Sequence, residues 1–119
     1  KSLFCVGEVS RGSFVHLLNG TPQSLIAAAR KASRLSEESA PPGVRERNVT
    51  FFIDCISRAL FLGDHLPEEF AAVAGETGLF GAMTLGEIAN NGCDYLEFYN
   101  KTAVVARLAD PPEPGLNPL

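Results

Sequence analysis

Residues 49–55 read VTFFIDC, and this stretch decides how the rest of the chain is arranged. It is apolar almost throughout, which is typical of a central strand that is covered on both faces. At 119 residues, the chain is long enough to bury one core without disulfides or metals. We therefore expect a single domain whose sheet is built around residues 49–55.

The sequence on either side predicts both helices and strands. Thr21 followed by Pro22 is typical of a helix start, and apolar residues then recur at helical spacing as far as position 35. The predicted elements are strands 3–9 and 14–18, helix 22–35, strand 49–55, a helical turn at 56–62, helix 67–74, and strands 79–88 and 95–108. We therefore expect an α+β fold of order ββαβαββ, in which a mixed sheet of about five strands packs against two or three helices.

The C-terminal end of the chain differs in composition from the rest. Residues 109–119 hold four of the eight prolines, which is typical of an extended tail or linker. We expect residues 1–108 to form the domain and 109–119 to follow it as a tail. Because position 1 is not methionine, we also expect the chain to be a processed or excised piece of something longer.

Charge and composition exclude several classes of function. The net charge is −4 with no basic patch, which argues against nucleic-acid binding. No run approaches the roughly 20 apolar residues that a membrane span requires. Three cysteines do not make a disulfide framework and fit a reducing compartment, so we expect a cytoplasmic location. His16 and His65 are isolated in the sequence, so we expect no metal site.

Cys55 and Arg58 stand where the predicted central strand ends, which is a position that favours ligands. Arg58 could hold a carboxylate or a phosphate in a two-pronged contact. The alternative is that Arg58 pairs with a nearby acid and Cys55 is a small buried hydrophobe. Both interpretations stay open at this point, and the second needs no ligand.

Three further polar residues lie in the last two predicted strands. Glu87 follows Gly86 in an otherwise apolar segment, and an unpaired buried carboxylate is costly. It therefore either recognises an ammonium or hydroxyl group or forms a structural ion pair, for which Arg58 is a candidate partner. Asn100 and Thr102 could hydrogen-bond a ligand or tie up neighbouring backbone.

The sequence contains three short blocks, which are CISR at 55–58, GAMTLGEIA at 81–89 and FYNKTAVV at 98–105. Together they resemble the C-terminal domain of FIST proteins (F-box and intracellular signal transduction). The family pattern has a strand ending in Cys and Arg, a Gly-x-x-x-x-Gly-Glu strand and then an Asn-x-Thr strand. All three occur here in that order, and the specific part of the resemblance covers residues 49–105. Tyr99 stands where many relatives carry His, so no role of that His is carried over.

The resemblance implies a sensory module that is paired with an N-terminal FIST domain of the same protein. It implies binding of a small molecule, with amino acids as candidates. The positions that match the pattern, and therefore the expected ligand-binding residues, are Cys55, Arg58, Glu87, Asn100 and Thr102. A second copy of the chain is a further candidate partner.

Two other functions stay open. A non-catalytic protein-interaction or dimerisation module would use the motif residues only to hold its structure. A thiol enzyme would use Cys55 as nucleophile and would need a base, such as a histidine, within hydrogen-bond reach. Because nothing in the local sequence activates the thiol, we expect no enzymatic activity, no catalytic residues and no cofactor.

Overall fold

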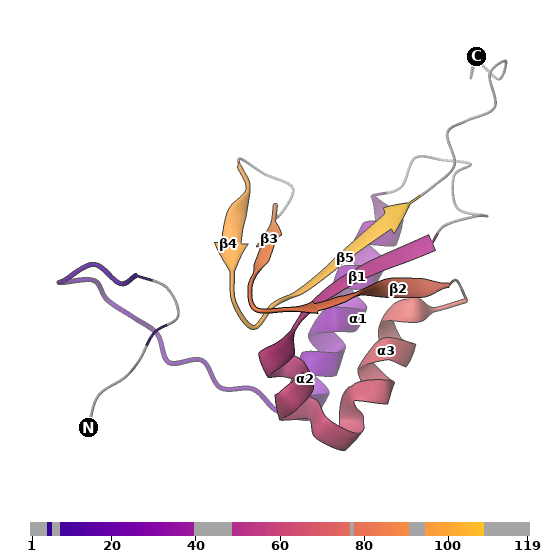
Figure 1. Ribbon diagram of the computed structural model, residues 1–119, viewed down its shortest axis with the longest axis horizontal. Helices are drawn as coiled ribbons and strands as arrows, with labels where there is room; N and C mark the ends of the chain where they lie inside the picture. The colour runs from indigo at the N-terminus through magenta and orange to yellow at the C-terminus, as the bar shows by residue number, and fades with distance from the viewer. Residues whose placement is uncertain (1–4, 6–7, 40–48, 77, 91–94, 109–119) are drawn as a thin grey trace, which may run out of the picture.

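A computed structural model of the protein describes residues 5, 8–39, 49–76, 78–90 and 95–108. A three-stranded sheet is packed against helices, and a smaller two-stranded sheet lies beside it (Figure 1). The elements in chain order are α1 (Pro22–Glu38), β1 (Val49–Cys55), α2 (Ile56–Leu62), a 3₁₀ turn η2 (Gly63–His65), α3 (Leu66–Ala74), β2 (Leu79–Thr84), β3 (Glu87–Ala89), β4 (Glu97–Tyr99) and β5 (Ala103–Leu108).

The strand β1 is central, as the sequence predicts. The larger sheet has the order β2-β1-β5, in which β2 runs parallel and β5 antiparallel to β1. The strands β3 and β4 form the antiparallel pair of the second sheet. The prediction of an α+β fold with a mixed sheet is therefore confirmed, although the five strands form two sheets rather than one.

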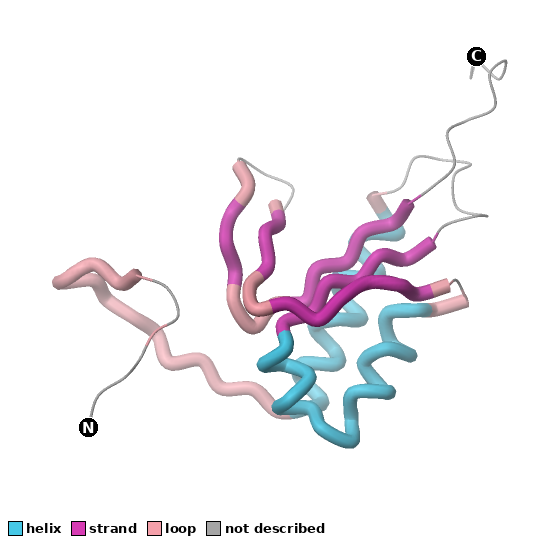
Figure 2. The backbone as a smooth tube through the Cα atoms, viewed as in Figure 1, coloured by secondary structure: helices cyan, strands magenta, loops and turns pink. Residues whose placement is uncertain are grey.

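The helices cover only one face of the larger sheet (Figure 2). Alternate residues of β1 are buried on this side, and Phe52 packs there with Ala29 of α1 and Val73 of α3. On the other side Phe51 and Ile53 are only half-buried. The expectation that β1 is covered on both faces is therefore wrong, and one apolar face of the sheet is open.

Helix α1 begins where the sequence predicts. The Thr21 hydroxyl accepts a hydrogen bond from the Ser24 backbone N–H at 3.2 Å, and the Ser24 hydroxyl accepts one from the Thr21 N–H at 2.8 Å. This reciprocal cap satisfies donors that the first turn leaves open. The helix continues one turn beyond the predicted end, as far as Glu38, where Arg34 pairs with Glu38 at 3.4 Å.

Both long strands predicted after residue 78 are interrupted. The first bends at Leu85 and Gly86, so that β2 and β3 belong to different sheets. A side chain at Gly86 would begin 2.5 Å from the Phe98 ring, so glycine allows the two strands to approach here. The second strand breaks at residues 100–102, where Lys101 has a positive φ of 57°. These two breaks turn β3 and β4 away from the larger sheet.

The predicted N-terminal hairpin is not formed. Its turn is present, since the Ser13 N–H donates to the Ser10 carbonyl at 3.1 Å, but Phe14–Leu18 is not a strand. Most of the predicted strand 3–9 lies outside the described residues, as does the predicted tail at 109–119. A hairpin that packs on nothing is marginal in water, and the side chain of Phe14 is fully exposed. Among the described helices, none is long and apolar enough to cross a bilayer.

Candidate functional site

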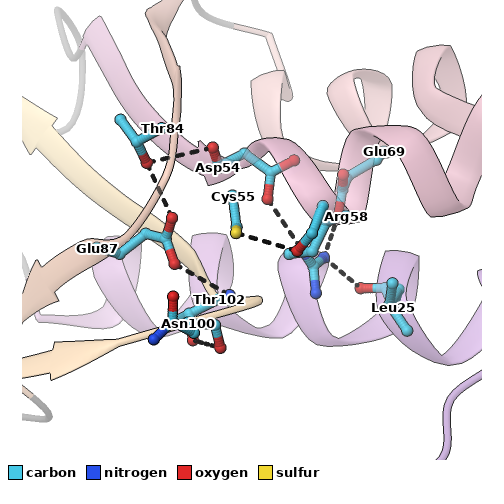
Figure 3. Close-up of polar contacts among 10 residues, drawn as sticks. Leu25, Asp54, Cys55, Arg58, Glu69, Thr84, Glu87, Asn100 and Thr102 are labelled. Carbon is cyan, nitrogen blue, oxygen red and sulfur yellow. Dashed lines mark hydrogen bonds and ion pairs between the residues drawn. The ribbon is translucent and has the colours of Figure 1, made fainter. Parts of the chain in front are cut away.

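Polar side chains gather in two neighbouring clusters where β1 ends (Figure 3). The Glu87 cluster consists of Thr84, Glu87 and Thr102, and the Arg58 cluster consists of Asp54, Arg58 and Glu69. Cys55 lies between them. Because β1 and β2 are parallel and Cys55 is in register with Thr84, the carboxyl ends of both strands lie at this site.

In the Glu87 cluster the carboxylate is buried and held by neutral donors. Glu87 is 1% exposed. Its Oε1 accepts a hydrogen bond from the Thr84 hydroxyl at 2.9 Å, and its Oε2 accepts one from the Thr102 backbone N–H at 3.3 Å. The ion pair with Arg58 that the sequence left open is not formed. No cation pairs with Glu87 within the described part of the chain.

The loop between β4 and β5 closes this cluster. The Cys55 N–H donates to the Thr102 carbonyl at 3.2 Å, which ties the loop to the end of β1. The Thr102 hydroxyl donates to the Asn100 carbonyl at 3.2 Å. The Asn100 side chain is half-buried and its carboxamide makes no hydrogen bond to another described residue. The structure thus brings Cys55, Asn100 and Thr102 together beside Glu87.

In the Arg58 cluster one guanidinium group pairs with two carboxyl groups. Arg58 Nε lies 2.8 Å from Asp54 Oδ1, and Nη2 pairs with Glu69 Oε1. The same nitrogen donates to the Leu25 carbonyl at 3.2 Å. All three charged side chains are buried. Arg58 therefore joins β1 and α2 to α1 and α3.

When Asp54 and Glu69 are both ionised, the Arg58 cluster has a net charge of −1. The pKa of Asp54 is raised from 3.8 to about 7, mainly by burial and then by the nearby Glu69 charge, while Arg58 opposes the rise. Asp54 Oδ2 and Glu69 Oε2 are buried without a hydrogen-bond partner among the described residues. Below a pH of about 7 the folded domain therefore binds a proton at Asp54.

Cys55 does not sit beside a base. Its Sγ lies 3.1 Å from the Ser57 hydroxyl and the side chain is buried. His65 Nδ1 lies 2.8 Å from Glu68 Oε1 instead, and His16 lies in the exposed N-terminal segment. Within the described residues, no group of three or more His, Cys, Asp or Glu side chains could hold a metal ion.

Comparison with known families identifies the chain. The family model of the FIST C domain matches residues 1–90. The chain belongs to the FIST C-domain family. This confirms the resemblance seen in the sequence and makes the chain part of a sensory, signal-transducing family. Searches of curated proteins and of solved structures found no match.

The family match covers two of the three blocks that suggested it. Residues 1–90 include CISR and GAMTLGEIA, whereas FYNKTAVV at 98–105 lies beyond the matched range. The match also begins ahead of α1, so the exposed segment before Thr21 belongs to the FIST C domain. The third block includes the loop between β4 and β5, whose Thr102 binds Glu87.

Sequence reasoning missed three residues of the FIST C site. Asp54 is an acid in an otherwise apolar strand, which is the same signal that pointed to Glu87. Thr84 gives no such signal, since threonine is common in strands. Glu69 was not recognised as a site residue, because an acid in the first turn of a helix is already explained by the helix dipole.

An apolar groove of the FIST C domain lies elsewhere. A groove of about 300 Å³ runs beside β2, on the side of α3. Its lining is apolar and consists of Phe52, Phe70, Leu79, Phe80, Gly81, Ala82 and Met83. Neither Glu87 nor Arg58 contributes to it, so the polar clusters and the groove are separate features.

Proposed function

We propose that this FIST C domain is a sensory domain that binds a small ligand at the Glu87 cluster, and that the ligand carries an ammonium group, as amino acids do. The observation that supports the proposal is the buried Glu87 carboxylate, which has two neutral donors and no cationic partner among the described residues. A buried charge without a counter-charge is costly, and a bound ammonium group would supply one.

The neighbours of Glu87 suit the rest of such a ligand. The Asn100 carboxamide offers donors and an acceptor that no described residue uses, and the Thr102 hydroxyl lies next to it. Cys55 supplies a small apolar wall between the clusters. A ligand carboxylate could reach Arg58 only by replacing Asp54 or Glu69 in its ion pairs, so we assign recognition first to Glu87 and a supporting role to Arg58.

A thermal-shift screen tests the proposal on this domain and on the intact protein that contains it. The probes are amino acids, the matching 2-hydroxy acids and the matching simple amines. We expect the melting temperature to rise with compounds that carry the ammonium group, because a ligand at 100 times its Kd stabilises by about 2.7 kcal/mol. Glu87→Gln should abolish the rise, whereas Glu76→Gln, which changes an exposed acid, should keep it.

Three outcomes carry different meanings. A rise that persists in a folded Glu87→Gln protein would refute the site. A rise confined to the intact protein would place the ligand between this domain and another part of that protein. No response from either form would refute ligand sensing by these compounds and favour the second candidate function.

The second candidate is a non-catalytic interaction module. It is favoured by the number of large apolar side chains that this domain exposes, since contiguous exposed apolar surface marks interaction sites. Phe14 and Leu18 in the N-terminal segment and Phe80 on the open sheet face are examples. On this proposal Glu87→Gln lowers the melting temperature and changes no ligand response.

A further inference from the structure

The groove beside β2 has the form of a site that accepts a strand. β2 pairs with β1 along one edge and with no other described strand along the other. On the side of the helices its residues alternate Leu79, Gly81 and Met83, in register with β1 residues whose side chains are buried there. Phe52 of β1 and Phe70 of α3 also line the groove. No side chain fits at position 81, since a Cβ there would lie 1.6 Å from the Phe52 carbonyl oxygen.

The outer edge of β2 lacks the features that protect exposed edges. Edge strands usually carry charged residues or proline, or are covered, because unpaired backbone invites another chain. β2 reads LFGAMT and has no charge and no proline. An apolar edge strand that borders an apolar groove therefore calls for a covering segment.

The same chain carries an exposed segment of matching chemistry. Residues 8–18, here called the arm, are exposed along their whole described length. Within the arm the run FVHLL is apolar apart from His16, and Leu17 and Leu18 are 87% and 93% exposed. The family match includes the arm, so the arm is a part of the domain that packs on no other described element of the single chain.

We propose that two copies of this domain exchange arms, with Phe14–Leu18 of each copy adding as a strand to the outer edge of β2 in the other. The added backbone continues the sheet, and alternate arm side chains enter the groove over Phe52 and Phe70. Reciprocal exchange gives a symmetric dimer in which both arms and both edges are covered.

The arm of one chain lies away from its own groove. It leaves the domain at Thr21, which caps α1, and extends away from the helices and the larger sheet (Figure 1). The groove lies at the outer edge of β2, beside α3. The residues from Leu18 to Pro22 span at most about 14 Å when fully extended, which limits how far Phe14–Leu18 can turn back toward it.

Sedimentation velocity of the 119-residue chain over a range of concentrations tests the exchange. We expect a reversible dimer. Phe14→Asp in the arm and Ala82→Lys in β2 should each raise its dissociation constant by about tenfold or more, the effect of losing an interface anchor. Leu60→Asp, which changes an exposed leucine of α2, should leave the constant within about twofold. A chain that stays monomeric at all concentrations, or that dimerises equally well with Phe14→Asp, overturns the proposal.

Disulfide cross-linking distinguishes exchange from other arrangements. Val15→Cys and Ala82→Cys are placed on separate chains that both also carry Cys5→Ser and Cys93→Ser. Mixing and mild oxidation should give a cross-linked dimer of the two chains, whereas Glu68→Cys in place of Ala82→Cys should not. A chain that carries both Val15→Cys and Ala82→Cys is oxidised in parallel. Cross-linking found only within that single chain, and not between the separate chains, would show that the arm folds back on its own sheet and would overturn exchange. The ligand response that depends on Glu87 is a separate measurement, so the two proposals can fail independently.

Discussion

At the scale of single residues, the decisive feature is that one arginine faces two buried acids. A group whose pKa is raised on folding binds a proton in the folded state that the unfolded chain has already released. The pKa of Asp54 rises from 3.8 to about 7 on folding, so the folded state binds this extra proton at pH values between 3.8 and about 7. The stability that it contributes is complete below pH 3.8 and is lost as the pH rises to 7, with no further loss above.

Asp54 should therefore make the domain less stable as the pH rises from 4 to 7. We expect a decrease in the free energy of unfolding of a few kcal/mol, since each unit of pKa shift corresponds to about 1.4 kcal/mol. Urea titrations at pH 5 and pH 8 measure it. Asp54→Asn should flatten the dependence, and Asp64→Asn, at an exposed position, should not. Parallel curves for the wild type and Asp54→Asn would contradict the assignment.

Arg58 should matter strongly for stability. Removing it leaves two buried carboxyl groups without their cation, and breaking a buried ion pair costs about 3–5 kcal/mol. Arg58→Ala should lower the free energy of unfolding by about that amount in urea at pH 7. Arg34→Ala, which breaks a pair on the exposed surface of α1, should cost less than about 1 kcal/mol. Equal effects of the two substitutions would show that the Arg58 cluster is not formed in solution.

At the scale of secondary-structure elements, local sequence signals predicted the helix caps and the central strand but not the breaks. Thr21 and Pro22 act through the backbone next to them, so the start of α1 follows from the sequence. The bend at Gly86 leaves room for the Phe98 ring, and the positive φ of Lys101 lies in the loop that closes on β1. Such breaks need contacts between distant residues, which no local pattern contains.

Gly81 gives a test at this scale. Gly81→Ala places a Cβ 1.6 Å from the Phe52 carbonyl oxygen, so the backbone of β1 or β2 must shift. Forcing extra atoms into a packed region costs about 1–3 kcal/mol and occasionally more, and we expect a loss at the upper end of this range in urea unfolding. Gly78→Ala, which meets nothing within 4 Å, is the matched control and should be nearly neutral. A neutral Gly81→Ala would mean that β2 does not lie as close to β1 as described.

At the scale of the whole molecule, the candidate site is assembled from segments that lie far apart in the sequence. Cys55 and Arg58 are neighbours in the chain, so their proximity could be predicted. That Thr102 reaches Glu87 depends on the pairing of β3 with β4, in which Glu87 is opposite Tyr99. That Glu69 reaches Arg58 depends on how α3 packs on the sheet. The sequence therefore pointed to several members of the site but to few of their contacts.

The contacts of Arg107 fix the order in which this domain can be completed. Arg107 lies in the last strand, and it donates to Thr50 at 2.6 Å and to Ser33 at 3.0 Å, which precede it by 57 and 74 residues. A ribosome releases the helices, β1 and β2 well before it releases β5. Until then the core lacks Ala103 and Val105, and one side of β1 has no partner. The nascent chain therefore completes its core only when its last strand is released, and until then one edge of β1 stays unpaired.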